Sequence, residues 1–170
     1  MSTEIERKFI VHHLPTAGVG SRIGIRQGYL AEEGETEVRV RITPDRAVIT
    51  VKIGGAHATE LGRGTRTEVE VAVGRDDAEE LWAHTKGRRI VKTRSRVDVD
   101  GGVAEIDIYE GVLHGLIVVE VEFESEQASA AFVPPGWFGP EVTGRVGWSN
   151  ASLARNGRPA EPPAVPMDAE

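Results

Sequence analysis

The chain has 170 residues, a length that suits one globular domain. Its 20 Lys and Arg against 27 Asp and Glu give a formal net charge of −7, which argues against a nucleic-acid partner because such proteins usually carry a basic excess. There is no cysteine, which excludes disulfides, zinc–thiolate sites, iron–sulfur clusters and a cysteine nucleophile. We find no apolar run of about 20 residues and no secretory leader, and therefore expect a cytoplasmic protein without a membrane partner.

Most of the chain alternates apolar and polar residues with a period of two, which is the pattern of β-strands with one buried face. Turn residues at 43–46 and 100–102 favour antiparallel pairing of the strands on either side. The predicted fold class is therefore mainly β. The alternation predicts strands at residues 3–11, 36–42, 49–53, 66–71, 91–94, 105–108 and 119–123.

Three helices are expected among these strands. The first begins near Asp76 or Asp77, either of which can cap it, and ends at Gly87, a residue type common just after a helix. Shorter helices are expected at 127–132 and 150–155. The chain then becomes rich in proline without a burial pattern, so we expect one domain at residues 1–155 and a disordered tail at residues 156–170.

The polar faces of the predicted strands carry pairs of like charges. Residues i and i+2 of a strand point to the same side and lie about 6–7 Å apart. Like charges this close are mildly destabilising, so an ordinary solvated face accounts for one pair but poorly for a series of them. The pairs are Glu4/Glu6, Arg39/Arg41, Glu68/Glu70, Lys92/Arg94, Glu105/Asp107 and Glu120/Glu122.

A sheet closed into a barrel with a charged interior explains the series of like-charge pairs better than a solvated face does. Closure also removes exposed sheet edges. Carboxylate oxygens in such an interior favour Mg²⁺, Mn²⁺ or Ca²⁺, while Arg and Lys bind phosphate oxygens. Phosphoryl transfer needs mainly positioning and charge neutralisation from a protein. The pattern therefore favours a cavity for a highly charged ligand that is accompanied by a divalent cation.

The segment Glu4-Ile5-Glu6-Arg7-Lys8 resembles the E-x-E-x-K signature of the CYTH superfamily, also called the triphosphate tunnel metalloenzymes. Further matches follow in the family's order, so the resemblance covers residues 2–155 and is to the short bacterial members. Ser95 and Trp148 depart from it, since those members often have Tyr at these places. The further matches are Gly28-Tyr29-Leu30 and residues 38–41, 50–52, 68–70, 92–94, 105–107, 119–123, 138–144 and 149–154.

The resemblance implies an α+β fold that is mainly β: an eight-stranded antiparallel β-barrel forming a charged tunnel, with a few helices packed outside. It implies Mg²⁺ or Mn²⁺ as the cofactor, held by Glu4, Glu6, Glu120 and Glu122. The phosphate-binding residues that it implies are Lys8, Arg39, Arg41, Lys52, Lys92 and Arg94. Supporting roles, in orienting these bases or binding a second metal, fall to Glu68, Glu70 and Asp107.

The sequence leaves two catalytic roles open. Lys8 and Lys52 are both candidates for positioning the nucleophilic water, and the sequence does not choose between them. Tyr29 would either donate a hydrogen bond to a catalytic lysine or simply pack beneath a strand end.

The resemblance favours metal-dependent hydrolysis of a small-molecule triphosphate, most of all inorganic tripolyphosphate, by a monomer or homodimer. Two activities of the same scaffold stay open. An adenylyl cyclase would need a pocket for adenine and ribose, to which no residue can be assigned, and a thiamine triphosphatase would need contacts to the thiamine rings. A non-catalytic polyphosphate-binding module would be favoured by the loss of a metal carboxylate, but all four carboxylates are present.

Overall fold

The computed structural model describes residues 5–15, 19–54 and 67–160. Expectations that involve Glu4, Arg66 or residues 161–170 lie outside these ranges. The elements, in chain order, are β1 (Ile5–Ile10), β2 (Ile23–Glu33), β3 (Thr36–Ile42), β4 (Ala47–Ile53), β5 (Thr67–Ala72), α1 (Arg75–Ala83), β6 (Arg89–Val99), β7 (Gly102–Tyr109), the single 3₁₀ turn η1 (Gly111–Leu113), β8 (Ile117–Phe123), α2 (Glu126–Ala131) and α3 (Asn150–Asn156).

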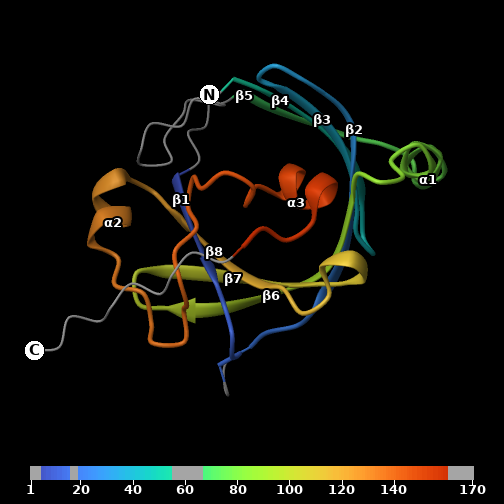
Figure 1. Ribbon diagram of the computed structural model, residues 1–170. Helices are drawn as coiled ribbons and strands as arrows, with labels where there is room; N and C mark the ends of the chain where they lie inside the picture. Colours follow the sequence, from blue (N-terminus) through green and yellow to red (C-terminus); the bar gives the residue numbers. More distant parts are fainter. Residues whose placement is uncertain (1–4, 16–18, 55–66, 161–170) are drawn as a thin grey trace, which may run out of the picture.

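The strands form one antiparallel sheet in the order β1-β8-β7-β6-β2-β3-β4-β5. The sheet curls around an interior that Figure 1 views along its length. The predicted class is confirmed, with one refinement. The order begins at β1 and ends at β5, and no pairing joins these two strands within the described residues, so hydrogen bonds do not close the sheet into a complete barrel.

Strand β2 is the one strand that the alternation did not predict. Its outward positions include Gly24 and Gly28, and its inward positions are not uniformly polar, so no simple two-residue period appears. Gly28 is needed for packing, because a Cβ atom there would lie 2.3 Å from the Thr85 hydroxyl oxygen. The β2 register also shifts between Tyr29 and Ala31, which marks a bulge.

Two helices cover the outer face of the sheet, as predicted. Ala78, Leu81 and Trp82 of helix α1 pack against the apolar outer side of β3 and β4. Helix α2 packs against β1 and β8, and Phe132 just after it joins their outer cluster. Its N-cap is Ser125, whose side chain accepts a hydrogen bond from the Ala128 N–H.

The expected ends of α1 were wrong. Gly74 is its N-cap and no side chain caps it, while Asp76 and Asp77 lie inside the first turn, where acidic residues still favour the helix dipole. The helix ends at Ala83, and Gly87 lies in the turn that follows, with a φ of 77°.

Helix α3 lies inside the curled sheet rather than outside it (Figure 1), which corrects the expectation that all helices pack on the exterior. Leu153 and Ala154 belong to an apolar cluster with inward-facing Ile10 and Tyr109. The Tyr109 hydroxyl donates a 2.6 Å hydrogen bond to Asn150 Oδ1. Apolar packing thus fills one end of the interior. Within the described ranges, no helix is long and apolar enough to span a membrane.

Candidate active site

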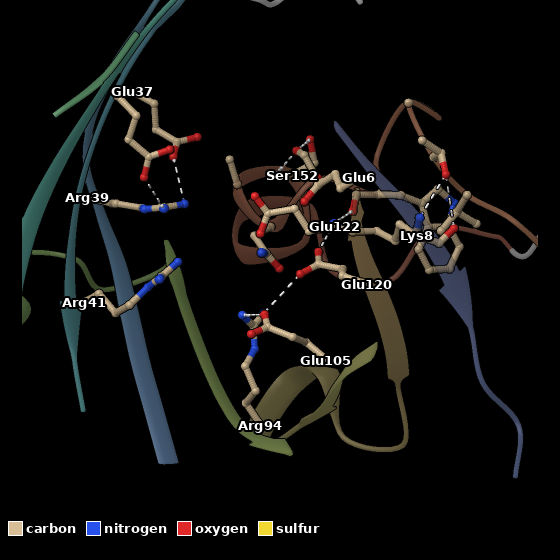
Figure 2. A pocket seen from close by; sticks show the side chains of 18 of the residues that line it. Glu6, Lys8, Glu37, Arg39, Arg41, Arg94, Glu105, Glu120, Glu122 and Ser152 are labelled. Carbon is tan, nitrogen blue, oxygen red and sulfur yellow. Dashed lines mark hydrogen bonds and ion pairs between the residues drawn. The ribbon is translucent and has the colours of Figure 1, made fainter. Parts of the chain in front are cut away.

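The curled sheet encloses a cavity of about 1160 Å³. Strand alternation decides which side chains face it, and register then aligns them across strands. One row crosses β6, β7, β8 and β1, and its members are Arg96, Glu105, Glu120 and Lys8. Within this row Arg96 lies opposite Glu105 and Lys8 lies opposite Glu120, while Glu105 and Glu120 lie opposite each other. Figure 2 shows Lys8, Glu105 and Glu120 in the cavity.

Lys8 is a buried cation of this row. Its Nζ atom lies 2.7 Å from Glu120 Oε1 and donates to the Trp148 carbonyl oxygen at 3.4 Å. Burial alone would lower the pKa of Lys8, but Glu120 and Glu6 raise it above its ordinary value. Burial opposes ionisation of Glu120 as well, yet Lys8, Lys92 and Arg94 hold its pKa well below the usual range. Both members of the pair are therefore charged.

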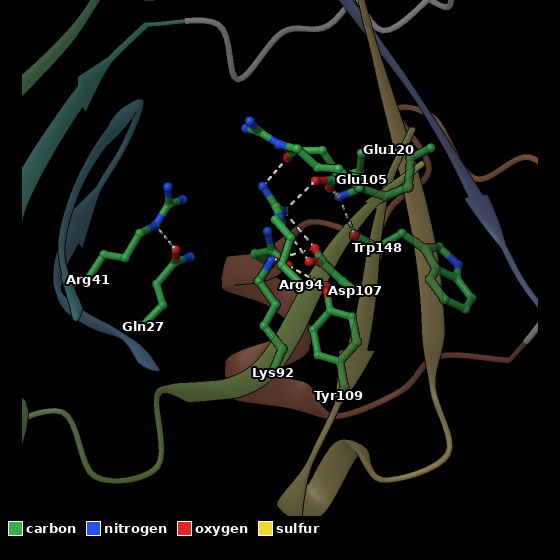
Figure 3. Close-up of polar contacts among 12 residues, drawn as sticks. Gln27, Arg41, Lys92, Arg94, Glu105, Asp107, Tyr109, Glu120 and Trp148 are labelled. Carbon is green, nitrogen blue, oxygen red and sulfur yellow. Dashed lines mark hydrogen bonds and ion pairs between the residues drawn. The ribbon is translucent and has the colours of Figure 1, made fainter. Parts of the chain in front are cut away.

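Asp107 holds two cations at once (Figure 3). It is fully buried, and its Oδ2 atom accepts from Lys92 Nζ at 2.6 Å. Arg94 binds the same carboxylate in a bidentate manner through Nε and Nη2, each at 2.7 Å. Arg94 also reaches Glu120 at 3.1 Å and forms an ion pair with Glu105. Asp107 thus orients two of the predicted phosphate-binding residues.

A second charged group lies across the cavity on β3, β4 and β5. Lys52 Nζ is 2.6 Å from Glu68 Oε2. Arg39 lies 3.5 Å from Glu68 and 3.6 Å from Glu37. Glu70 accepts a 3.2 Å hydrogen bond from the Thr50 hydroxyl. Glu68 thus contacts two of the predicted phosphate-binding residues, Arg39 and Lys52, whereas Glu70 contacts Thr50 and lies 4.0 Å from Arg46.

Arg41 differs from these cations. Its Nε atom donates to the Gln27 side-chain oxygen at 2.9 Å, and it forms no ion pair with any described residue. Gln27 in turn donates to the Tyr29 hydroxyl at 2.6 Å. The Tyr29 hydroxyl therefore contacts Gln27 and not a lysine, which was the partner in one of the two expectations for this residue. Burial, then the nearby charges of Arg39 and Arg94, lower the pKa of Arg41.

The carboxylates expected to bind metal lie where β1 meets β8. Glu6 and Glu122 are directly opposite in register, and both line the cavity. Glu122 is exposed, and within the described residues its carboxylate has no ion pair or hydrogen bond. Glu120 is engaged by Lys8 and Arg94. These oxygens suit a hard divalent cation, although the described residues contain no group of three ligands arranged to hold one.

The structure therefore places most described members of the predicted site in the lining of one cavity. Lys52, Lys92 and Asp107 are buried and do not line it. Lys52 is paired with the lining residue Glu68, and Asp107 is paired with Lys92 and with the lining residue Arg94. Reasoning from sequence missed Gln27 and Glu37. Glu37 shares a face with Arg39 and Arg41, and the i, i+2 rule applied one step further would have found it. Gln27 was missed because β2 was not recognised as a strand. The cavity wall also includes Arg46, Arg96 and residues 142–152.

The fold and the site together define a class of protein in which a curled antiparallel sheet surrounds a cavity lined by charged side chains. Comparison with known proteins then gives the family. The CYTH domain matches residues 2–134, and the chain belongs to the CYTH family.

Two curated relatives cover nearly the whole chain. An inorganic triphosphatase of Nitrosomonas europaea is 40% identical over 154 residues, which are 89% of this chain and 97% of that protein. An inorganic triphosphatase of Acetivibrio thermocellus is 32% identical over 157 residues, which are 92% of this chain and 96% of that protein. The crystal structure of the inorganic triphosphatase NE1496 aligns with a TM-score of 0.70 and 38% identity, over 91% of this chain and 96% of that one.

Proposed function

We propose that the protein hydrolyses a triphosphate in its interior cavity, with inorganic tripolyphosphate as the favoured substrate. The observation that carries the proposal is Arg41, a guanidinium that points into the cavity and forms no ion pair with any described residue (Figure 2). It lies near Arg39 and Arg94, so three positive charges surround space that a polyanion can enter. The two curated relatives, both inorganic triphosphatases, support the same activity.

Substrate binding is assigned to the basic side chains around the cavity. Guanidinium groups bind phosphate oxygens in a bidentate manner, and ammonium groups act as compact point charges. Carboxylate partners hold all of them except Arg41 in place before substrate arrives, which reduces the ordering needed on binding. The proposed phosphate-binding residues are Lys8, Arg39, Arg41, Lys52, Lys92 and Arg94, supported by Glu68, Glu70 and Asp107.

A divalent cation, Mg²⁺ or Mn²⁺, is the proposed cofactor. Glu6 and Glu122 would hold it, with Glu120 beside them, and Glu4 lies outside the described residues. When bound, the cation supplies neutralisation of phosphate charge and activation of water. The exposed, uncommitted carboxylate of Glu122 fits this role, because a hard cation prefers oxygen ligands.

The remaining chemistry is assigned to groups of the chain. Lys8 lines the cavity, and Glu120 and Glu6 raise its pKa, so its assigned role is to orient the attacking water or stabilise the transferring phosphoryl group. Lys52 keeps the alternative role of positioning water from the opposite wall. Arg41 and Arg94 stabilise the charge that develops on the leaving pyrophosphate. Tyr29 is assigned a supporting role: its hydroxyl accepts a hydrogen bond from Gln27, which in turn accepts one from Arg41.

Two variants test the proposal with tripolyphosphate as substrate. Arg41→Ala and Glu122→Gln should each lower kcat/KM by about 100-fold or more, the effect of removing one charge-stabilising group. Both should keep the wild-type melting temperature, because Arg41 makes one neutral hydrogen bond and Glu122 is exposed.

The matched controls are Arg22→Ala and Glu80→Gln. Both residues are exposed and neither lines the cavity. We expect wild-type activity from both controls. Full activity in both Arg41→Ala and Glu122→Gln would show that the reaction does not take place in this cavity.

A further inference from the structure

Gln27 occupies an unusual position for a neutral side chain. It is fully buried in β2, among the charged groups of the interior, and lies directly opposite Arg41 in the register with β3. Its amide bridges the Arg41 Nε atom at 2.9 Å and the Tyr29 hydroxyl at 2.6 Å. Figure 3 shows the amide oxygen directed at the guanidinium.

The chemistry of the three groups fixes the direction of this chain of hydrogen bonds. A guanidinium has donors only, so the side of the Gln27 amide that faces Arg41 must be its oxygen. The amide nitrogen must then face Tyr29, and it donates to the Tyr29 hydroxyl oxygen. Arg41 thus fixes the orientation of the amide, and the Tyr29 hydroxyl, which can donate or accept, takes the hydrogen bond from the amide nitrogen. The order of the contacts is from Arg41 to Gln27 to Tyr29.

This contact orients Arg41 without neutralising it. The other phosphate-binding cations proposed above each have a carboxylate within 4.0 Å. Arg41 has two neutral neighbours in register, Gln27 on β2 and Val48 on β4. A carboxylate at position 27 would compete with an incoming phosphate for the same guanidinium, whereas an amide holds the guanidinium and leaves its charge available.

We propose that Gln27 is a positioning residue that aims Arg41 at the substrate, and that its neutrality is a requirement of the site. The proposal rests on the proposed function, because it assigns the aimed guanidinium to a phosphate group of the substrate. Gln27 acts through Arg41 and does not itself react.

The test is a double-mutant cycle that joins Gln27 and Arg41, measured as kcat and KM for tripolyphosphate hydrolysis. Gln27→Glu keeps the shape of the side chain and adds a negative charge, so it should raise KM about tenfold or more. Gln27→Met keeps the length but removes the acceptor, so it should lower kcat/KM about tenfold. In an Arg41→Ala background, Gln27→Met should alter kcat/KM less than about twofold, because the residue on which it acts is gone.

Gln127→Glu is the matched control, since it makes the same change at an exposed position in α2 and should behave as the wild type. If Gln27→Glu does not fold, Gln27→Met carries the test alone. Equal losses from Gln27→Met with and without Arg41, or an unchanged KM in folded Gln27→Glu, would overturn the proposal.

The cycle also separates this proposal from the proposed function. If the wild type hydrolyses no triphosphate, the same variants are compared by calorimetric titration with inorganic tripolyphosphate. Coupling between Gln27 and Arg41 in binding then supports the positioning role although catalysis fails, and independent effects on binding overturn it.

Discussion

At the scale of single residues, strand register decides which charges are satisfied. Asp107 is opposite Arg94 in the β6–β7 pair, whereas Arg41 is opposite an amide and a valine. The like-charge pairs of the sequence correctly predicted a charged interior. They did not predict which cation lacks a carboxylate partner, because that depends on which residues of neighbouring strands lie opposite one another.

Replacing Asp107 should markedly lower the free energy of unfolding. Asp107→Asn would leave Lys92 and Arg94 buried with one negative charge fewer between them. Removing one partner of a buried ion pair typically costs about 3–5 kcal/mol, so the free energy of unfolding in urea should fall by roughly that amount. Asp98→Asn, an exposed change on β6, serves as the control. Similar unfolding curves for the two variants would contradict the role assigned to Asp107.

At the scale of elements, alternation predicted seven of the eight strands. It predicted them because each has one polar and one apolar face. It failed for β2, which carries Gly28 where Thr85, in the turn after α1, approaches closely. It also failed to place α3, since amphipathic pattern shows that a helix packs against something but not on which side of a curled sheet.

A surface contact also ties β1 to the segment after α2. Arg7, whose charge interrupts the apolar face of β1, binds Glu141 through Nε at 2.9 Å and Nη2 at 2.7 Å. It also donates to the Ser129 and Phe132 carbonyl oxygens. Arg7 lies between Glu6 and Lys8 on β1, and both of these residues line the cavity. The contact with Glu141 therefore holds the part of β1 that carries them.

The Arg7–Glu141 pair predicts a pH dependence of stability. Burial raises the pKa of Glu141, but Arg7 and Thr143 outweigh it and lower the pKa below the ordinary value. A depressed pKa contributes stability above the unfolded-state pKa, about 4.3, and loses it as pH falls through the folded-state pKa. Glu141→Gln should therefore lower the free energy of unfolding by about 1 kcal/mol at pH 7, and the difference from wild type should shrink at acidic pH.

The measurement is thermal melting of both proteins between pH 7 and pH 3, with Glu80→Gln as an exposed control on α1. The control should follow the wild type throughout. A destabilisation by Glu141→Gln that is equal at both ends of this range would show that ionisation of Glu141 does not contribute.

At the scale of the whole molecule, the net charge of −7 argues against a polyanion ligand. The cavity weakens that inference, because the cations near it lie among carboxylates that can bind a divalent metal. Net charge governs attraction at long range, while the cavity acts within a few ångströms of its ligand. The acidic excess is thus a reason to expect cation dependence and weak nucleic-acid binding. Since the chain has no cysteine, no metal ligand of the site can be a thiolate.

The most direct test of the central claim is phosphate release by the wild-type protein from tripolyphosphate, ATP and thiamine triphosphate, with Mg²⁺, with Mn²⁺ and with a chelator. Formation of cyclic AMP from ATP is measured alongside. We expect the highest kcat/KM for tripolyphosphate, no cyclic AMP, and loss of activity with the chelator. Equal or faster turnover of a nucleotide, or full activity without a divalent cation, would contradict the central claim.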